Sequence, residues 1–117
     1  MIKSLGYKIL SITLTLIILV IVIAYSPKAY TPSVSGTATL NFGSTIPGAA
    51  TDLTMTVTGS AVGDVVILGV PNGSMPANGV YFAWVSATNT VSVRYINTDL
   101  IATFDPASGS FKSTILK

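Results

Sequence analysis

The feature that most constrains this chain is an uncharged, strongly apolar stretch that runs from Ile9 to Pro27, between Lys8 and Lys28. As a helix rising 1.5 Å per residue, this stretch would span roughly 28 Å, about the hydrocarbon thickness of a bilayer. The sequence therefore predicts an N-terminal tail with one transmembrane helix over residues 1–30 and a separate domain over residues 31–117. The predicted membrane-embedded side chains are Ile9, Leu10, Leu14, Leu16, Ile17, Ile18, Leu19, Val20, Ile21, Val22 and Ile23.

A secretory signal peptide is an alternative interpretation of the same segment, because residues 22–24 (Val-Ile-Ala) fit a small-residue cleavage site. The apolar run is long for a signal peptide. It also ends with Tyr25, Pro27 and Tyr30, which are typical of interfacial anchors and a helix stop. These features indicate an uncleaved, single-pass anchor that makes the lipid bilayer one partner of the chain.

The layout of a short leader, a long apolar helix and a β-rich domain also resembles type IV pilins. In that family a prepilin peptidase would cut after Gly6, in front of Tyr7. The chain departs from the bacterial pattern at the fifth mature position, where Ser11 stands in place of the usual Glu. The pilin-like filament subunit is therefore a third hypothesis.

Charge and residue types narrow the function of residues 31–117. This part of the sequence contains three basic residues and four aspartates, a formal charge of 3 − 4 = −1. It therefore lacks the clustered Lys and Arg residues of a nucleic-acid-binding site. The chain has no Cys, His or Glu, which removes thiolate sites, the common general bases and most metal ligands. We therefore expect no enzyme activity, no cofactor, no metal and no small-molecule substrate. Three of the aspartates, Asp64, Asp99 and Asp105, adjoin turns and are expected to bond local backbone.

From residue 37 onward, apolar and polar residues alternate in short runs, which is the pattern of half-buried β-strands. The core faces are predicted to contain Ala38, Leu40, Phe42, Leu53, Met55, Val57, Val91, Val93 and Tyr95. In the last strand the core face is either that of Phe111, Ser113 and Ile115 or the opposite face with Leu116. The continuous apolar run 65–68 indicates a strand covered on both sides, and residues 100–104 a short seventh strand. Turn residues separate these runs, so the predicted fold is all-β: a small antiparallel sandwich of immunoglobulin-like or jelly-roll-like kind.

Two segments are candidates for contact with a partner. Val80, Phe82 and Trp84 alternate with Tyr81, and we expect Trp84 in the core and Tyr81 on the surface. The loop from Pro71 to Gly79 is the longest predicted connection, and such loops carry recognition. The predicted contact residues are Asn72, Met75, Asn78 and Tyr81.

Three motifs in this domain resemble a small β-domain that recurs in virion structural proteins of bacteriophages and prophages. They are Thr51-Asp-Leu-Thr-Met-Thr-Val-Thr-Gly-Ser-Ala-Val-Gly-Asp-Val-Val66, then Trp84-Val-Ser-Ala-Thr-Asn-Thr-Val-Ser-Val-Arg94 with Asn97, and Asp105-Pro-Ala-Ser-Gly-Ser-Phe111. The resemblance implies a non-enzymatic virion component, and the added helix would suit a phage whose capsid encloses a membrane. Its expected partners are then capsid, vertex or other virion proteins, and a second copy of the chain.

The alternative is a bacterial surface-anchored adhesion or interaction domain in the inner membrane. Lys3 and Lys8 precede the apolar segment and Lys28 follows it, a bias that favours export of the domain.

Overall fold

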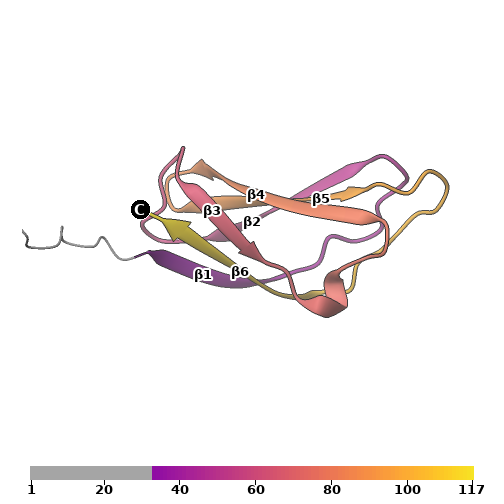
Figure 1. The fold of residues 1–117 in the computed structure, drawn as a ribbon, viewed down its shortest axis with the longest axis horizontal. Helices are drawn as coiled ribbons and strands as arrows, with labels where there is room; N and C mark the ends of the chain where they lie inside the picture. The colour runs from indigo at the N-terminus through magenta and orange to yellow at the C-terminus, as the bar shows by residue number, and fades with distance from the viewer. Residues whose placement is uncertain (1–32) are drawn as a thin grey trace, which may run out of the picture. The chain divides into compact units, whose positions relative to one another are not determined.

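The computed structural model describes residues 33–117, which form an all-β domain of two antiparallel sheets (Figure 1). The strands are β1 (Val34–Leu40), β2 (Ala50–Thr56), β3 (Val65–Gly69), β4 (Gly79–Ala87), β5 (Thr90–Asn97) and β6 (Gly109–Leu116), with a 3-10 turn η1 (Asn72–Ser74) between β3 and β4. One sheet has the order β1-β6-β3 and the other β2-β5-β4. The predicted all-β, sandwich-like architecture is thereby confirmed.

The predicted transmembrane segment lies outside the described residues. Within 33–117, no helix has the length and apolar character needed to cross a bilayer.

The connections divide the domain into two ends. Only β4 and β5 are neighbours both in sequence and in a sheet, so every other connection crosses between sheets. The loops 41–49, 70–78 and 98–108 gather at one end, which we call the distal end (Figure 1). The start of β1 and the C-terminus lie at the opposite end.

The core forms where the inner faces of the two sheets meet. Successive side chains of a strand point to opposite faces of the sheet, so in β2 Leu53 and Met55 point inward while Asp52 and Thr54 point to solvent. The fully or nearly buried apolar side chains are Leu40, Phe42, Met55, Val57, Val85, Val91, Val93, Tyr95, Phe111 and Ile115. All except Val85 lie on faces that the sequence offers as core faces, whereas Ala38 and Leu53, which are also predicted for the core, are only partly buried. Aromatic rings dominate one part of this core, where Phe42 makes edge contacts with Tyr81 and Phe111.

Gly36 in β1 allows the two sheets to approach closely. A Cβ atom at this position would lie 2.6 Å from the carbonyl oxygen of Thr56 at the end of β2. Because that oxygen belongs to the backbone, it has no side-chain freedom with which to give way. Glycine is therefore the residue that fits at this crossing of β1 and β2.

The structure reverses the predicted orientation of β4. Tyr81, Ala83 and Val85 face the core, whereas Val80 and Phe82 are 45% and 43% exposed on the outer face, where Trp84 also lies. The prediction of a core Trp84 and a surface Tyr81 is wrong. The physical reason is that both faces of β4 are apolar, so alternation separates the two sets without saying which one is inside.

Two further strand predictions are wrong. Residues 65–68 are not covered on both sides, because burial alternates along β3 and leaves Val65 and Ile67 more than half exposed on the outer face of the sheet. Residues 100–104 do not form a strand; Phe104 makes a single isolated bridge to Thr45, and the described part of the chain has six strands.

Candidate binding surface

The outer face of the β2-β5-β4 sheet carries a group of aromatic and charged side chains that are exposed or partly buried. Register places Asp52, Arg94 and Phe82 in one row across the three strands, with Trp84 two residues along β4 from Phe82. We call these four residues the aromatic strip. The rings of Phe82 and Trp84 have centroids 5.7 Å apart and planes inclined by 32°. Sheet pairing, rather than any one loop, thus holds the strip in place.

Arg94 is fixed at the centre of the strip by contacts of two kinds. Its Nε and Nη2 each donate a 2.6 Å hydrogen bond to one carboxylate oxygen of Asp52. Its guanidinium carbon also lies 5.2 Å from the Trp84 ring centroid and 5.8 Å from that of Phe82. The hydrogen bonds lower the pKa of Asp52 and raise that of Arg94, so both groups stay charged. The result is a preorganised surface of aromatic rings around a stacked guanidinium.

The chemistry of the strip is that of a binding surface. Trp and Arg are the side chains most enriched among the energetically dominant residues of protein interfaces. Large apolar side chains next to one another on an outer sheet face also lose contact with water when a partner covers them. Because Asp52 and Arg94 already neutralise each other, a partner can cover the strip without burying an unpaired charge.

The predicted contact residues lie in different environments. Asn72 and Asn78 are exposed in the connection from β3 to β4, and Met75 between them is 54% exposed. Tyr81 is instead an inner-face residue whose hydroxyl donates a 2.7 Å hydrogen bond to the carbonyl of Ser74. Burial raises the pKa of Tyr81 to about 12, so the hydroxyl remains a donor at ordinary pH. Its structural role is to fasten the η1 loop to the sheet.

The loop from residue 98 to 108 is held by side-chain amide and carboxylate groups. Asn97 is fully buried, and its Nδ2 donates to the carbonyls of Thr45 and Ala102 at 2.9 Å. Asp99 Oδ1 accepts hydrogen bonds of 2.8 Å from the backbone N–H groups of Ile101 and Ala102. The expected turn role of Asp99 is therefore confirmed, and these bonds lower its pKa.

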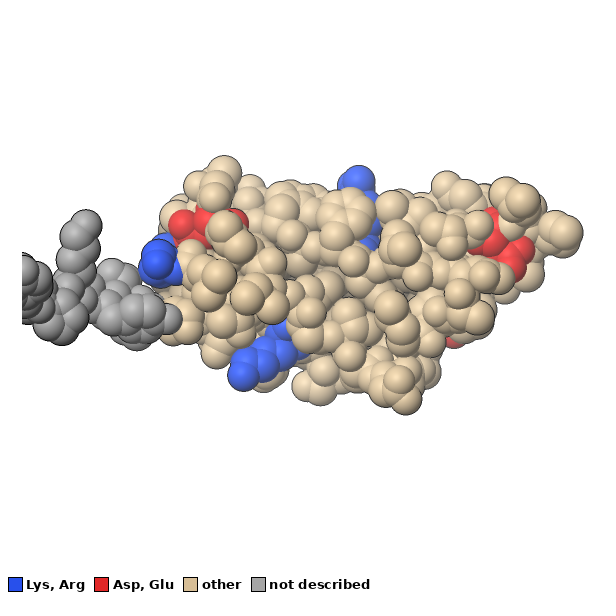
Figure 2. Space-filling view, viewed as in Figure 1, with Lys and Arg blue, Asp and Glu red and all other residues tan. Residues whose placement is uncertain are grey.

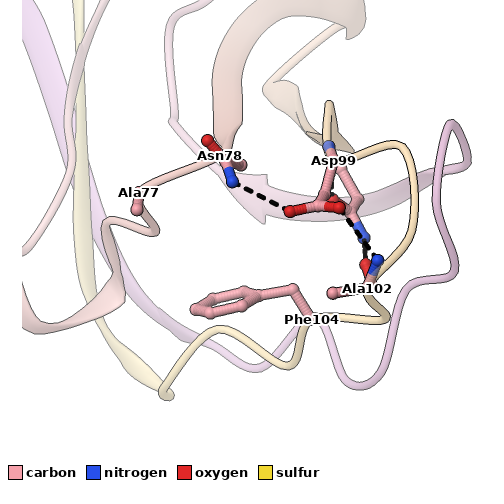
Figure 3. Close-up of a pocket in the computed structure, with 6 residues that line it drawn as sticks. Ala77, Asn78, Asp99, Ala102 and Phe104 are labelled. Carbon is pink, nitrogen blue, oxygen red and sulfur yellow. Dashed lines mark hydrogen bonds between the residues drawn. The ribbon is translucent and has the colours of Figure 1, made fainter.

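A small pocket of about 100 Å³ opens beside this loop. Asn78 and Asp99 point toward each other across it, with a 2.8 Å hydrogen bond between them, and Phe104 forms its opposite wall (Figure 3). Ligand pockets for drug-sized molecules begin at roughly 300 Å³. This pocket has the size for one side chain of a partner.

Sequence reasoning missed the aromatic strip and the two apolar residues at the tip of the 98–108 loop, Leu100 and Ile101. One sequence signal could have identified the strip, namely that Arg94 falls on the face opposite Val93 and Tyr95. Among residues 33–117, no group of three Asp residues is arranged to hold a metal ion. Comparisons with protein-family models, with curated proteins and with solved structures find no match to this chain.

Proposed function

We propose that this chain is a membrane-anchored structural protein of a lipid-containing bacteriophage particle, and that its β-domain binds a capsid or vertex protein through the aromatic strip. The observation that carries the binding role is the stack of Arg94 on the rings of Phe82, which is exposed, and Trp84, which is partly buried, on the outer face of the sheet. Adjacent large apolar side chains on an outer sheet face are typical of surfaces that a partner covers. The strip therefore supports a protein interface on this sheet.

The rest of the proposal is supported by the sequence. The apolar run from Ile9 to Pro27 supports the membrane anchor. The lack of His, Glu and Cys supports a role in assembly rather than catalysis. The motifs at residues 51–66, 84–94 and 105–111 support the phage setting, because they resemble those of virion β-domains.

We further propose that the domain belongs to the immunoglobulin-like or jelly-roll-like group of sandwiches. Support comes from its connections, since all but the β4–β5 hairpin pass from one sheet to the other. Greek-key folds share this crossing pattern, whereas meanders do not.

Mass spectrometry of purified phage particles, before and after chloroform extraction of their lipid, tests the setting. We expect peptides of this chain in the intact particle and their depletion with the lipid fraction. Absence of the peptides from both preparations would refute the virion role.

Paired variants test the strip itself. Phe82→Ser removes an exposed ring of the strip, whereas Ile67→Ser removes a similarly exposed apolar side chain from the outer face of the other sheet. We expect the first variant to lower the amount of chain incorporated in particles by about tenfold or more, as for an interface hot spot, and the second to leave it unchanged. Equal incorporation of the two variants would contradict a contact through the strip.

A bacterial surface-anchored adhesion domain is the second candidate, and the pair of rings on the outer sheet face also supports it. Phe82 and Trp84 would also stack on the apolar face of a sugar, with Asp52 beside them as a hydrogen-bond acceptor. This function predicts cleavage of the domain by protease added to intact spheroplasts and a gene outside any phage cluster. Protection of the domain in spheroplasts would contradict it.

A further inference from the structure

The tip of the 98–108 loop presents two large apolar side chains to solvent. Leu100 is 92% exposed and Ile101 is 90% exposed, the highest values among the large apolar residues that the structure describes. They lie at the distal end of the domain, remote from the start of β1 and from the C-terminus (Figure 1). Exposure of this degree leaves essentially all of both side chains available to a partner.

The loop that carries them is built to keep this shape. The amide of Asn97 ties it to Thr45, and Asp99 accepts two backbone N–H groups from the turn immediately beyond Leu100. Asn78 adds a hydrogen bond from the neighbouring connection. A loop tip whose conformation is fixed before the partner binds loses little conformational entropy on binding, and this raises the affinity.

The charges around the tip indicate the chemistry of its partner. Arg94 and Lys117 form ion pairs with Asp52 and Asp64. Asp99, in contrast, has no Lys or Arg partner among the described residues. Figure 2 shows acidic atoms, and no basic ones, at the distal end on the face in view. The tip is therefore both apolar and negatively charged.

We propose that the Leu100–Ile101 tip is a second docking element, which inserts into an apolar pocket of a protein partner whose rim carries Lys or Arg. A basic side chain from this rim enters the pocket between Asp99, Asn78 and Phe104, which has the volume for one such side chain. There the carboxylate of Asp99 provides an ion pair and the Phe104 ring a cation–π contact. The surface of a lipid bilayer is the less favourable occupant, because its phosphate groups repel Asp99.

Site-specific photo-crosslinking of the full-length protein in its producing cells tests this proposal. p-Benzoylphenylalanine replaces Leu100 in one variant and Val62 in a control, since Val62 is 70% exposed at the opposite end. We expect a discrete protein adduct from position 100 alone, with the crosslinked partner peptide mapped by mass spectrometry to an apolar pocket flanked by Lys or Arg. Adding Asp99→Asn should lower the adduct by about tenfold, because it removes the charge from the pocket. Unchanged Trp84 fluorescence verifies that each variant is folded.

Several outcomes would overturn the docking element. They are adducts with lipid only, adducts with a second copy of this chain, equal labelling from positions 62 and 100, and insensitivity to Asp99→Asn. The proposal rests on the binding role argued above but can fail separately from it. A crosslinker at Phe82 reports on the strip, so adducts from Phe82 without any from Leu100 refute the tip alone. A basic-rimmed partner that is absent from phage particles supports the tip and refutes the virion setting.

Discussion

Replacing Trp84 by alanine tests whether the aromatic strip lies outside the hydrophobic core. In the structure this ring packs against Phe82 and beneath Arg94, and it is not among the buried core residues. An aromatic pair contributes about 0.5–1.5 kcal/mol and an exposed cation–π contact about 0.5–1 kcal/mol. We therefore expect Trp84→Ala to lower the free energy of unfolding by about 1–2.5 kcal/mol. A buried tryptophan would cost about 3–5 kcal/mol.

Urea unfolding of the full-length protein in detergent micelles, followed by circular dichroism, measures this loss. Phe111→Ala is the matched comparison, because Phe111 is an aromatic residue with no exposed surface, and we expect it to cost about 3–5 kcal/mol. Trp84 is the only tryptophan of the chain, so its fluorescence gives an independent check. Acrylamide should quench this emission in the folded protein. A loss above about 3 kcal/mol together with weak quenching would show that the ring is buried and would refute the strip.

Four further predictions concern the fold. Gly36→Ala should lower stability by about 1–3 kcal/mol in the same unfolding assay, because its Cβ would overlap the Thr56 carbonyl; an unchanged midpoint would mean that β1 and β2 are less closely packed. Tyr81→Phe should cost about 0.5–1.5 kcal/mol, since it removes the hydrogen bond to Ser74. Tyr95→Phe should leave stability unchanged or raise it, because the buried Tyr95 hydroxyl has no hydrogen-bond partner among the described residues. Equal losses of stability in Tyr81→Phe and Tyr95→Phe would contradict this prediction. The stability of the fold should also fall in acid. Three carboxylates have a lower pKa in the folded state than the ordinary aspartate value of 3.8, so their full contribution to stability is present above pH 3.8. This contribution disappears as the pH falls through their folded-state pKa values. These carboxylates are Asp52, Asp64 and Asp99. Thermal melts between about pH 5 and 2 measure the loss of stability, and Asp64→Asn should make this loss smaller. A melting temperature that does not change with pH would contradict the prediction.

Alternation identifies most of the core from the sequence because most strands have one apolar and one polar face. In β2, the threonines and Asp52 mark the solvent side, so Leu53 and Met55 can be assigned to the interior. In β4 no polar residue distinguishes the faces before Ser86, and the large apolar ring of Trp84 then favours the wrong face as the interior. The structure instead places the smaller Ala83 and Val85 inside with Tyr81, where the neighbouring rings of Phe42 and Tyr95 fill the space.

The rest of the candidate surface depends on tertiary information. Phe82, Arg94 and Asp52 are separated in the sequence, and only sheet register brings them into one row. The apolar run 65–68 could not reveal that β3 would be an edge strand, since edge position follows from strand order. Leu100 and Ile101 have a strand-like sequence, but the buried Asn97 and the Asp99 turn hold them in a loop. Side-chain hydrogen bonds outweigh local β propensity there.

The pairing of β1 with β6 has a consequence for synthesis on the ribosome. Among the described strands, β1 is an edge strand whose only sheet neighbour is β6, and Val34 pairs with Ile115, which lies 115 − 34 = 81 residues later in the sequence. β1 is synthesised before the other five described strands, yet its backbone donors and acceptors find their partners only when β6, the last of these strands, has been made. Closing such a long loop is slow, and until then an unpaired strand with exposed N–H and C=O groups is open to pairing with other chains. The sheet that contains β1 can therefore form only after β6 has left the ribosome, and until then β1 is the strand that most needs protection from other chains.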